Sequence, residues 1–369
     1  MNSESSRQTS ASPTDLAYQA HVLPGVSRTF ALTIPVLPDQ LATVMTNAYL
    51  LCRLADTIED DIGLNSEQKS DFHRRFVAVV EGSEPAEPFA ADLLPLLSER
   101  VLPAERDLVA NAAAVLRVTH SCTPAERAAL ERCVRIMCTG MPEFQRNKSL
   151  RGLADLDELA AYCYHVAGVV GEMCTELFCL HTPELAERRE EMMRLAPSFG
   201  QGLQMTNILK DIWDDRQAGA CWLPRTAFGN GKFDLTRLEE LHETREFKEG
   251  LDSLIGVAHA HLRNALEYTC MVPKREAGIR RFCLWAIGLA VLTLRKIHHH
   301  PGFRSGAEVK VSRRTVKATV FATNLTLLSN RTLGLMFARA ADGLPLADLE
   351  EPNKGAVLAT VPGRRVDAN

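Results

Sequence analysis

Apolar residues recur at spacings of three and four along most of the chain, and this periodicity restricts the fold more than any other feature. It runs through residues 41–60, 74–81, 106–120, 124–139, 156–180, 185–215, 247–270, 277–299 and 315–338. Such spacing places apolar side chains on one face of an α-helix, and the alternation typical of β-strands is nearly absent. The sequence therefore predicts an all-α fold, with a single domain of about ten helices or more.

Clusters of Gly, Pro, Asn and Asp separate these helical stretches. They predict turns at residues 61–65, 82–85, 139–142 and 229–231. No linker long enough to divide two domains lies between them. We expect residues 1–14 to form a disordered tail, residues 15–340 to form the domain, and residues 341–369 to be loosely ordered.

Charge and hydropathy exclude several classes of protein. With 42 Lys plus Arg against 46 Asp plus Glu, the chain lacks the basic excess that nucleic-acid binding requires. The N-terminus has no apolar run of the kind a signal peptide needs. The longest apolar stretch, residues 282–294, is too short to span a bilayer and is typical of a buried helix. The ten cysteines lack metal-site spacing. We therefore expect a cytoplasmic protein with reduced thiols and no transmembrane helix.

Two segments carry carboxylates at helical spacing beside an apolar face. In the first, YLLCRLADTIEDD at residues 49–61, Asp56 and Asp60 are four residues apart and Glu59 is three from Asp56. The second is QMTNILKDIWDDR at residues 204–216. Its polar stripe consists of Gln204, Asn207, Asp211 and Asp215, with Asp214 beside it. Residues at these spacings share one helix face.

Like charges stacked on a helix cost a few tenths of a kcal/mol per pair, so a cation should offset them. Mg²⁺ prefers oxygen ligands and is held by one or two carboxylates together with substrate phosphate oxygens. Helical bundles build metal sites from side chains on facing helices. Two facing acidic rows would thus hold a diphosphate through bridging metal ions. A solvated helix end remains the alternative interpretation of each row taken alone.

The motifs occur in an order that resembles the squalene and phytoene synthases. Its carriers are SRTF at residues 27–30, the first acidic segment, YCYHVAGVVG at residues 162–171, and the second acidic segment. The resemblance extends over residues 25–324, most of the chain. It implies a helical isoprenoid synthase bundle around a central cavity, acting on prenyl diphosphates, with farnesyl diphosphate the expected substrate.

The resemblance also assigns roles residue by residue. Asp56, Asp60, Asp211 and Asp215 would hold Mg²⁺, with Asn207 as a further ligand. Tyr162 would act near a carbocation or as a proton acceptor. The expected substrate-binding residues are Ser27, Arg28, Phe30, Tyr49, Arg53, Tyr162, Gln204, Asn207, Lys210 and Phe282. For Phe199, packing in the core is the preferred interpretation, and the glycines at 168 and 171 would let helices approach closely.

Members of this family condense two prenyl diphosphates to a cyclopropyl intermediate, and only squalene synthases then quench the rearranged cation with hydride from NADPH. No GxGxxG motif follows a strand, so a cofactor would sit on helices. The basic stretch Lys310, Arg313 and Arg314 resembles one that binds the extra phosphate of NADPH, and it is equally interpreted as a solvated helix start. We predict a squalene synthase. A phytoene or dehydrosqualene synthase is the alternative, followed by a non-catalytic prenyl-binding helical protein.

Three departures from the family pattern bear on this choice. Ala220 stands where a basic residue is expected, so a contact is lost or comes from Arg216 or Arg225. Lys210 replaces a common arginine, which keeps the charge and loses the bidentate fork. The membrane-anchoring C-terminal helix of eukaryotic members is missing from the sequence, which favours a bacterial type. A loose, peripheral association with membranes is left open.

Overall fold

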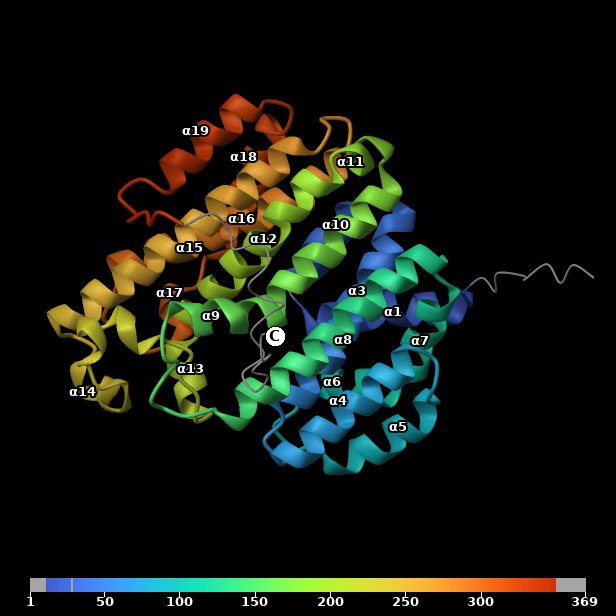
Figure 1. Ribbon diagram of the computed structural model, residues 1–369. Coiled ribbons are helices and arrows are strands. Elements are labelled where there is room, and N and C mark those ends of the chain that lie inside the picture. Colours follow the sequence, from blue (N-terminus) through green and yellow to red (C-terminus); the bar gives the residue numbers. More distant parts are fainter. Residues whose placement is uncertain (1–10, 28, 350–369) are drawn as a thin grey trace, which may run out of the picture.

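The computed structural model describes residues 11–27 and 29–349, and every named element within them is helical (Figure 1). The first part of the chain forms α1 (Pro13–Val26), α2 (Phe30–Thr33), α3 (Asp39–Asp60), α4 (Ser66–Val80), α5 (Ala86–Leu93), α6 (Pro103–Ala110), α7 (Ala112–Ser121) and α8 (Pro124–Arg146). The middle forms α9 (Leu156–Cys163), α10 (Val169–His181), α11 (Pro183–Glu187), α12 (Arg189–Lys210), α13 (Ile212–Gln217) and α14 (Leu238–Leu241). The last part forms α15 (Arg245–Met271), α16 (Ala277–His299), α17 (Gly306–Val309), α18 (Arg313–Thr326) and α19 (Asn330–Ala340). The predicted all-α fold is confirmed.

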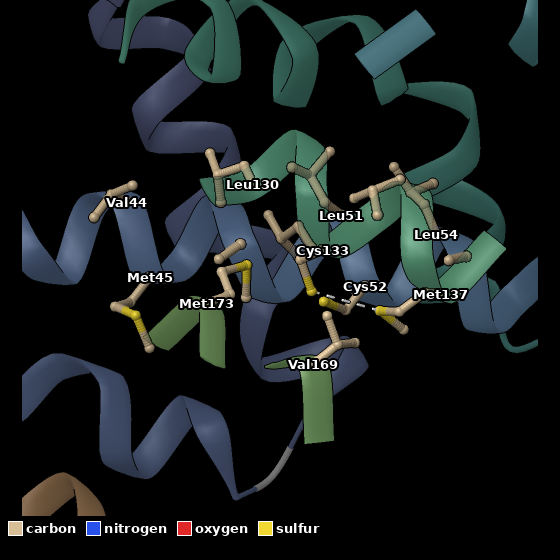
Figure 2. Close-up of a cluster of buried hydrophobic side chains, with 14 of the residues drawn as sticks. Val44, Met45, Leu51, Cys52, Leu54, Leu130, Cys133, Met137, Val169 and Met173 are labelled. Carbon is tan, nitrogen blue, oxygen red and sulfur yellow. Dashed lines mark hydrogen bonds between the residues drawn. The ribbon is translucent and has the colours of Figure 1, made fainter. Parts of the chain in front are cut away.

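Two large hydrophobic cores hold these helices together. The first is built mainly from α1, α3, α4, α5, α7, α8 and α10. Figure 2 shows part of it, where Met45 and Cys52 of α3 meet Cys133 of α8 and Met173 of α10. The second is built mainly from α9, α12, α13, α15 and α16. Val166 and Phe199 pack against both cores, so the two halves of the bundle meet there, as core packing at Phe199 predicts.

Glycines allow α10 and α12 to approach closely at this junction. A Cβ on Gly171 would lie 2.1 Å from the carbonyl oxygen of Ala196, and one on Gly200 would lie 2.0 Å from that of Ala167. No side chain fits at either position, which confirms the close-approach role expected for Gly171. Gly168 instead lies against the ring of Tyr164, within a π-helical turn at Tyr164–Gly168 that separates α9 from α10.

Several predicted boundaries are wrong. The turn expected at residues 139–142 is absent, because α8 continues through Pro142 to Arg146 with its apolar face buried. The stretch 106–120 is broken at Asn111 and the stretch 315–338 at residues 327–329, where Ser329 caps α19. Local caps and packing, which periodicity does not register, decide these breaks.

The helix predicted over residues 277–299 is confirmed as α16. It is the one helix among residues 11–27 and 29–349 that is long and apolar enough to cross a membrane, with a mean hydropathy of 1.5. Its most apolar window is 67% buried against neighbouring helices, as in the core helix of a globular protein. All ten cysteines are free.

Candidate active site

The first acidic row lies at the C-terminal end of α3. Asp56, Glu59 and Asp60 occupy its last two turns, and no basic residue lies in the last one. Because a helix C-terminus carries partial negative charge, carboxylates there are unfavourable unless a cation offsets them. Asp61 points elsewhere, since its carboxylate accepts hydrogen bonds from the Ser98 backbone N–H at 2.9 Å and hydroxyl at 3.0 Å. Glu59 is buried, so of the four acidic residues in this motif Asp56 and Asp60 are left accessible to a ligand.

Desolvation dominates the electrostatics of this row. It raises the pKa of Asp56 to about 7, with Asp60 adding to the rise and Arg53 opposing it. It also raises the pKa of Glu59 to about 8, although Gln145 donates a hydrogen bond to that carboxylate at 3.0 Å. Asp60 remains accessible to solvent, yet the surrounding protein raises the pKa of its carboxyl as well. An accessible group with protein on most sides lies in a recess.

Arg53 connects the first row to its surroundings. Its guanidinium lies 4.0 Å from Asp56 and 3.6 Å from Glu105, and it donates a hydrogen bond at 3.0 Å to the hydroxyl of Tyr49. That hydroxyl in turn donates to the backbone carbonyl of Val26 at 3.0 Å. The arginine is thus held in a fixed orientation one turn before Asp56, with donors available to an anion.

An aromatic group adjoins Arg53. The ring of Phe30 lies 4.9 Å from that of Tyr49 and 6.2 Å from that of Phe282, measured between centroids. The hydroxyl of Ser27 accepts a hydrogen bond from the backbone N–H of Phe30 at 3.0 Å and so begins the turn that positions it. The structure therefore brings Ser27, Phe30, Tyr49, Arg53 and Phe282 together. Arg28 lies outside the described residues.

The second acidic row spans a helix junction. Gln204 and Asn207 lie on α12, Asp211 is the residue between α12 and α13, and Asp214 and Asp215 lie in the first turn of α13. The single helix predicted over residues 185–215 is therefore wrong in detail. The predicted stripe is nevertheless kept, because the backbone N–H of Asp211 bonds to the Asn207 carbonyl at 2.8 Å and that of Asp215 to the Asp211 carbonyl at 2.9 Å.

Lysine partly neutralises the second row. The ammonium of Lys210 lies 3.0 Å from the carboxylate of Asp211 and donates to the amide oxygen of Asn207 at 3.2 Å. Desolvation raises the pKa of Asp211 despite this partner. The pKa of Asp215 is raised to about 7, first by desolvation and then by Asp211, Asp60 and Asp214. The contribution of Asp60 indicates that this residue of the first row lies near Asp215 of the second.

Tyr162 lies between the two rows. Its ring stacks on Trp222 with centroids 4.2 Å apart, and Phe144 contacts it edge-on at 5.3 Å. Burial raises the pKa of its hydroxyl well above the usual value, and Glu59, Asp60 and Asp215 add to that rise. Carboxylates from both rows thus raise the pKa of one phenol, which stays protonated at neutral pH.

Lys148 is a site residue that the sequence motifs did not identify. Its charge lowers the pKa of both Asp60 and Asp215, so it faces the two rows together. It lies in the loop after α8, where no helical spacing signals it. Backbone hydrogen bonds from Cys221 to Ser149 and from Leu153 to Leu223, both 3.0 Å long, fasten this loop to the segment that follows the second row.

The two arginines considered as substitutes for a basic residue at position 220 are engaged elsewhere. Arg216 donates to the backbone carbonyls of Leu235, at 3.0 Å, and Thr236. Arg225 donates to the carbonyl of Gly152 at 3.0 Å. Ala220 itself is buried. Lys148 lies in the loop that bonds to Cys221, the next residue along, through the Ser149 carbonyl.

The basic stretch at residues 310–314 adjoins the second row. A Cβ on Gly306 of α17 would lie 3.0 Å from the carboxylate of Asp211 and 3.3 Å from that of Asp214, so α17 packs directly on the row. The charge of Lys310 lowers the pKa of Asp211. Arg313 and Arg314 lie exposed in the first turn of α18. The predicted cofactor residues are thus near the site, with their charges open to solvent.

The donor set fits a hard divalent cation. The facing groups are carboxylates and amide oxygens, which are the ligands of Mg²⁺, and the soft cysteine thiols lie in the cores. Across the part of the chain that the structure describes, no three Asp, Glu, His or Cys side chains converge as a closed metal site.

Two solved structures resemble this protein in fold. The structure of TcSQS in complex with a ligand has a TM-score of 0.72 at 22% identity and covers 88% of this chain and 92% of its own. A dehydrosqualene synthase in complex with a ligand has a TM-score of 0.63 at 22% identity and covers 86% and 97%. The protein therefore shares the all-helical fold of these two structures.

Sequence comparison gives the family. The family model described as squalene/phytoene synthase matches residues 23–315, so the chain belongs to that family. Squalene synthase ERG9 of Candida albicans is 27% identical over 319 residues, covering 83% of this chain and 65% of the relative. Squalene synthase ERG9 of Gibberella zeae is 27% identical over 303 residues, covering 79% and 59%. The chain thus spans about two thirds of these relatives or less.

Proposed function

We propose that the protein is a Mg²⁺-dependent squalene synthase, which joins two farnesyl diphosphates head to head through presqualene diphosphate and then reduces the product with NADPH to squalene. The observation that carries this proposal is the proximity of the two acidic rows. Asp60 raises the pKa of Asp215, and both carboxylates raise the pKa of Tyr162. Family membership supplies the reaction class. The substrate and cofactor assignments belong to the proposal.

The chain's own residues divide the work on the diphosphate. Asp56 and Asp60 on one side, and Asp211, Asp215 and Asn207 on the other, would hold the metal ions. When bound, Mg²⁺ neutralises the departing pyrophosphate and so eases cleavage of the allylic C–O bond. The nearby cationic side chains would hold phosphate oxygens directly as the negative charge grows. They are Arg53, Lys148 and Lys210.

The aromatic group beside Arg53 suits the hydrocarbon end of the substrate. Phe30, Tyr49 and Phe282 form a continuous apolar surface, and Phe282 also packs on the buried ring of Phe178 at 6.0 Å. Such rings exclude water, and their faces attract positive charge. Tyr162 adds a stacked ring between the acidic rows. Because the pKa of its hydroxyl is raised, the phenol keeps its proton and can donate a hydrogen bond to the diphosphate.

The reductive step rests on the basic stretch. Lys310, Arg313 and Arg314 follow α17, which packs on the second row, so a phosphate bound by them would lie close to the reacting diphosphate. The runner-up is a dehydrosqualene or phytoene synthase that omits reduction. The fold does not separate the two, since both kinds of synthase share it, with TM-scores of 0.72 and 0.63.

Incubation of the purified chain with farnesyl diphosphate separates these functions. We expect pyrophosphate release that requires Mg²⁺ and stops on adding a chelator, with squalene formed only when NADPH is present. A non-reduced C30 product in the presence of NADPH would establish the runner-up. Absence of pyrophosphate release with both farnesyl and geranylgeranyl diphosphate would leave a non-catalytic prenyl-binding protein. Asp157→Asn, which removes an exposed carboxylate outside the site, is the matched control for carboxylate variants.

A further inference from the structure

The most exposed large apolar side chains among the described residues gather on α18, α19 and the turn between them. Phe321, Leu325, Leu328 and Leu335 are 66%, 71%, 61% and 64% exposed, whereas no other large apolar side chain in the described ranges exceeds 55%. Residues 321, 325 and 328 recur at helical spacing, so they form one outward stripe. An exposed apolar patch of this kind marks an interaction site. We call these four residues the apolar patch.

Basic side chains flank the apolar patch, and the nearest acidic residues along the chain are Glu308 and Asp342, at the two ends of this segment. Residues 309–341 contain six Lys or Arg and no Asp or Glu, in a chain whose net charge is −4. Lys317 lies one turn before Phe321, and Arg331 and Arg339 lie one turn either side of Leu335. None of these three pairs with a carboxylate within residues 11–27 and 29–349. The surface is therefore apolar and cationic together.

The inner side of this hairpin packs on the bundle, where Phe337 and Ala340 of α19 lie against the second core. Leu327 and Leu333 pack on Leu266 of α15 and Leu284 of α16 in a third, separate cluster. The buried guanidinium of Arg280 fixes the turn, donating to the Leu327 carbonyl at 2.9 Å and to the Asn330 side chain at 2.6 Å. Beneath the helices lies a largely apolar cavity of about 320 Å³. In Figure 1, α19 lies at the edge of the bundle opposite α4 and α5.

We propose that the α18–α19 hairpin docks on an anionic lipid surface, with the apolar patch inserted among the acyl chains and Lys317, Arg331 and Arg339 at the headgroups. Apolar insertion with cations at the rim is the mode of interfacial helices on membranes. A second copy of the chain fits less well, since a two-fold contact through this face would bring like charges together. The inference needs no assumption about the reaction, because the surface is separate from the acidic rows.

Vesicle co-sedimentation of the full chain, without substrate, tests the proposal. We expect binding to phosphatidylcholine vesicles that contain phosphatidylglycerol, little binding to phosphatidylcholine alone, and weakening by salt. The double variant Phe321→Ser, Leu325→Ser should reduce the partition coefficient roughly ten- to hundredfold, because two large apolar side chains no longer leave water. The matched control is Leu102→Ser, Leu180→Ser, which removes exposed apolar side chains elsewhere and should bind as the unmodified chain does.

Three results would overturn the proposal. One is equal binding by the patch variant and the control. Another is a dimer in sedimentation velocity that the patch variant abolishes while vesicles bind neither protein, which would assign the face to self-association. The third is amide exchange over residues 321–335 that vesicles leave unchanged while they protect another part of the chain, which would place the lipid contact elsewhere. Pyrophosphate release is measured in detergent for all variants. Equal release in every variant would show that a loss of vesicle binding leaves the proposed enzymatic function intact.

Discussion

The two acidic rows have similar sequences and different environments. The first ends a long, continuous helix, where desolvation and the helix end disfavour charged carboxylates and the guanidinium of Arg53 lies 4.0 Å from Asp56, against 3.0 Å between Lys210 and Asp211 in the second. The second spans the α12–α13 junction, is more open, and carries its own partner in Lys210. The first row therefore depends more strongly on an external cation, and the second on its own lysine. Four predictions probe this difference, beginning with the largest effect.

Removing one carboxylate from either row should abolish turnover. For Asp56→Asn and Asp211→Asn we expect pyrophosphate release to fall by about 10³-fold or more, because metal-ion stabilisation contributes several kcal/mol to such transition states. The measurement is a coupled pyrophosphate assay at saturating Mg²⁺, with Asp157→Asn as control. Near-normal release by one variant would mean that only the other row acts on the diphosphate.

Lys148 should matter to both rows at once. Lys148→Met is expected to lower kcat/KM by roughly ten- to hundredfold, since a hydrogen bond to a charged group contributes about 1.5–3 kcal/mol. Lys248→Met, which removes an exposed lysine on α15, is the matched control. If Lys148→Met loses no more activity than that control, Lys148 does not contact the diphosphate and serves only to reduce the repulsion between carboxylates in the free protein.

The free energy of unfolding of the metal-free protein should fall as the pH rises from about 4 to 8. The folded pKa values of Asp56, Glu59 and Asp215 are about 7, 8 and 7, above those of the unfolded chain. The folded state therefore binds more protons than the unfolded state within that window. The protonated carboxyl groups stabilise the fold fully at a pH below their unfolded pKa values, and this stabilisation is lost as the pH rises through their folded pKa values.

Denaturant titrations in a chelator measure this slope. Asp56→Asn should flatten it and stabilise the metal-free protein at pH 8 by on the order of 1 kcal/mol relative to the unmodified chain. Asp157→Asn should leave the slope as it is. A slope unchanged in Asp56→Asn would mean that the pKa of Asp56 is not raised in the folded state.

Lys210→Arg should have the smallest effect. The guanidinium keeps the charge beside Asp211 and restores a bidentate fork for phosphate. Because net hydrogen-bond differences are about 1 kcal/mol, we expect kcat/KM to change by less than about tenfold. Steady-state kinetics with Lys210→Met in parallel checks this. A loss in Lys210→Arg as large as in Lys210→Met would show that the compact ammonium, and not the charge alone, is required.

Helical spacing predicted much of the site, with limits that particular residues illustrate. Asp56 and Asp60 could be placed on one face because both lie within one continuous helix. Asp211 kept its predicted stripe although a helix ends there, since i to i−4 hydrogen bonds continue through the junction. Lys148 could not be found, because a loop residue acquires its place only through backbone pairing with residues 221–224. Asp61 belonged to the motif by spacing and turned away to bind Ser98.

By itself the sequence determined the all-helical fold class, the family and the two acidic rows, because periodicity and motif order are local properties of the chain. Only the tertiary structure decided that the rows face each other across Tyr162, that Lys148 lies between them, and that the α18–α19 hairpin leaves its apolar side chains outside the bundle. These facts depend on contacts between distant segments, whose energies arise only when the two cores pack together.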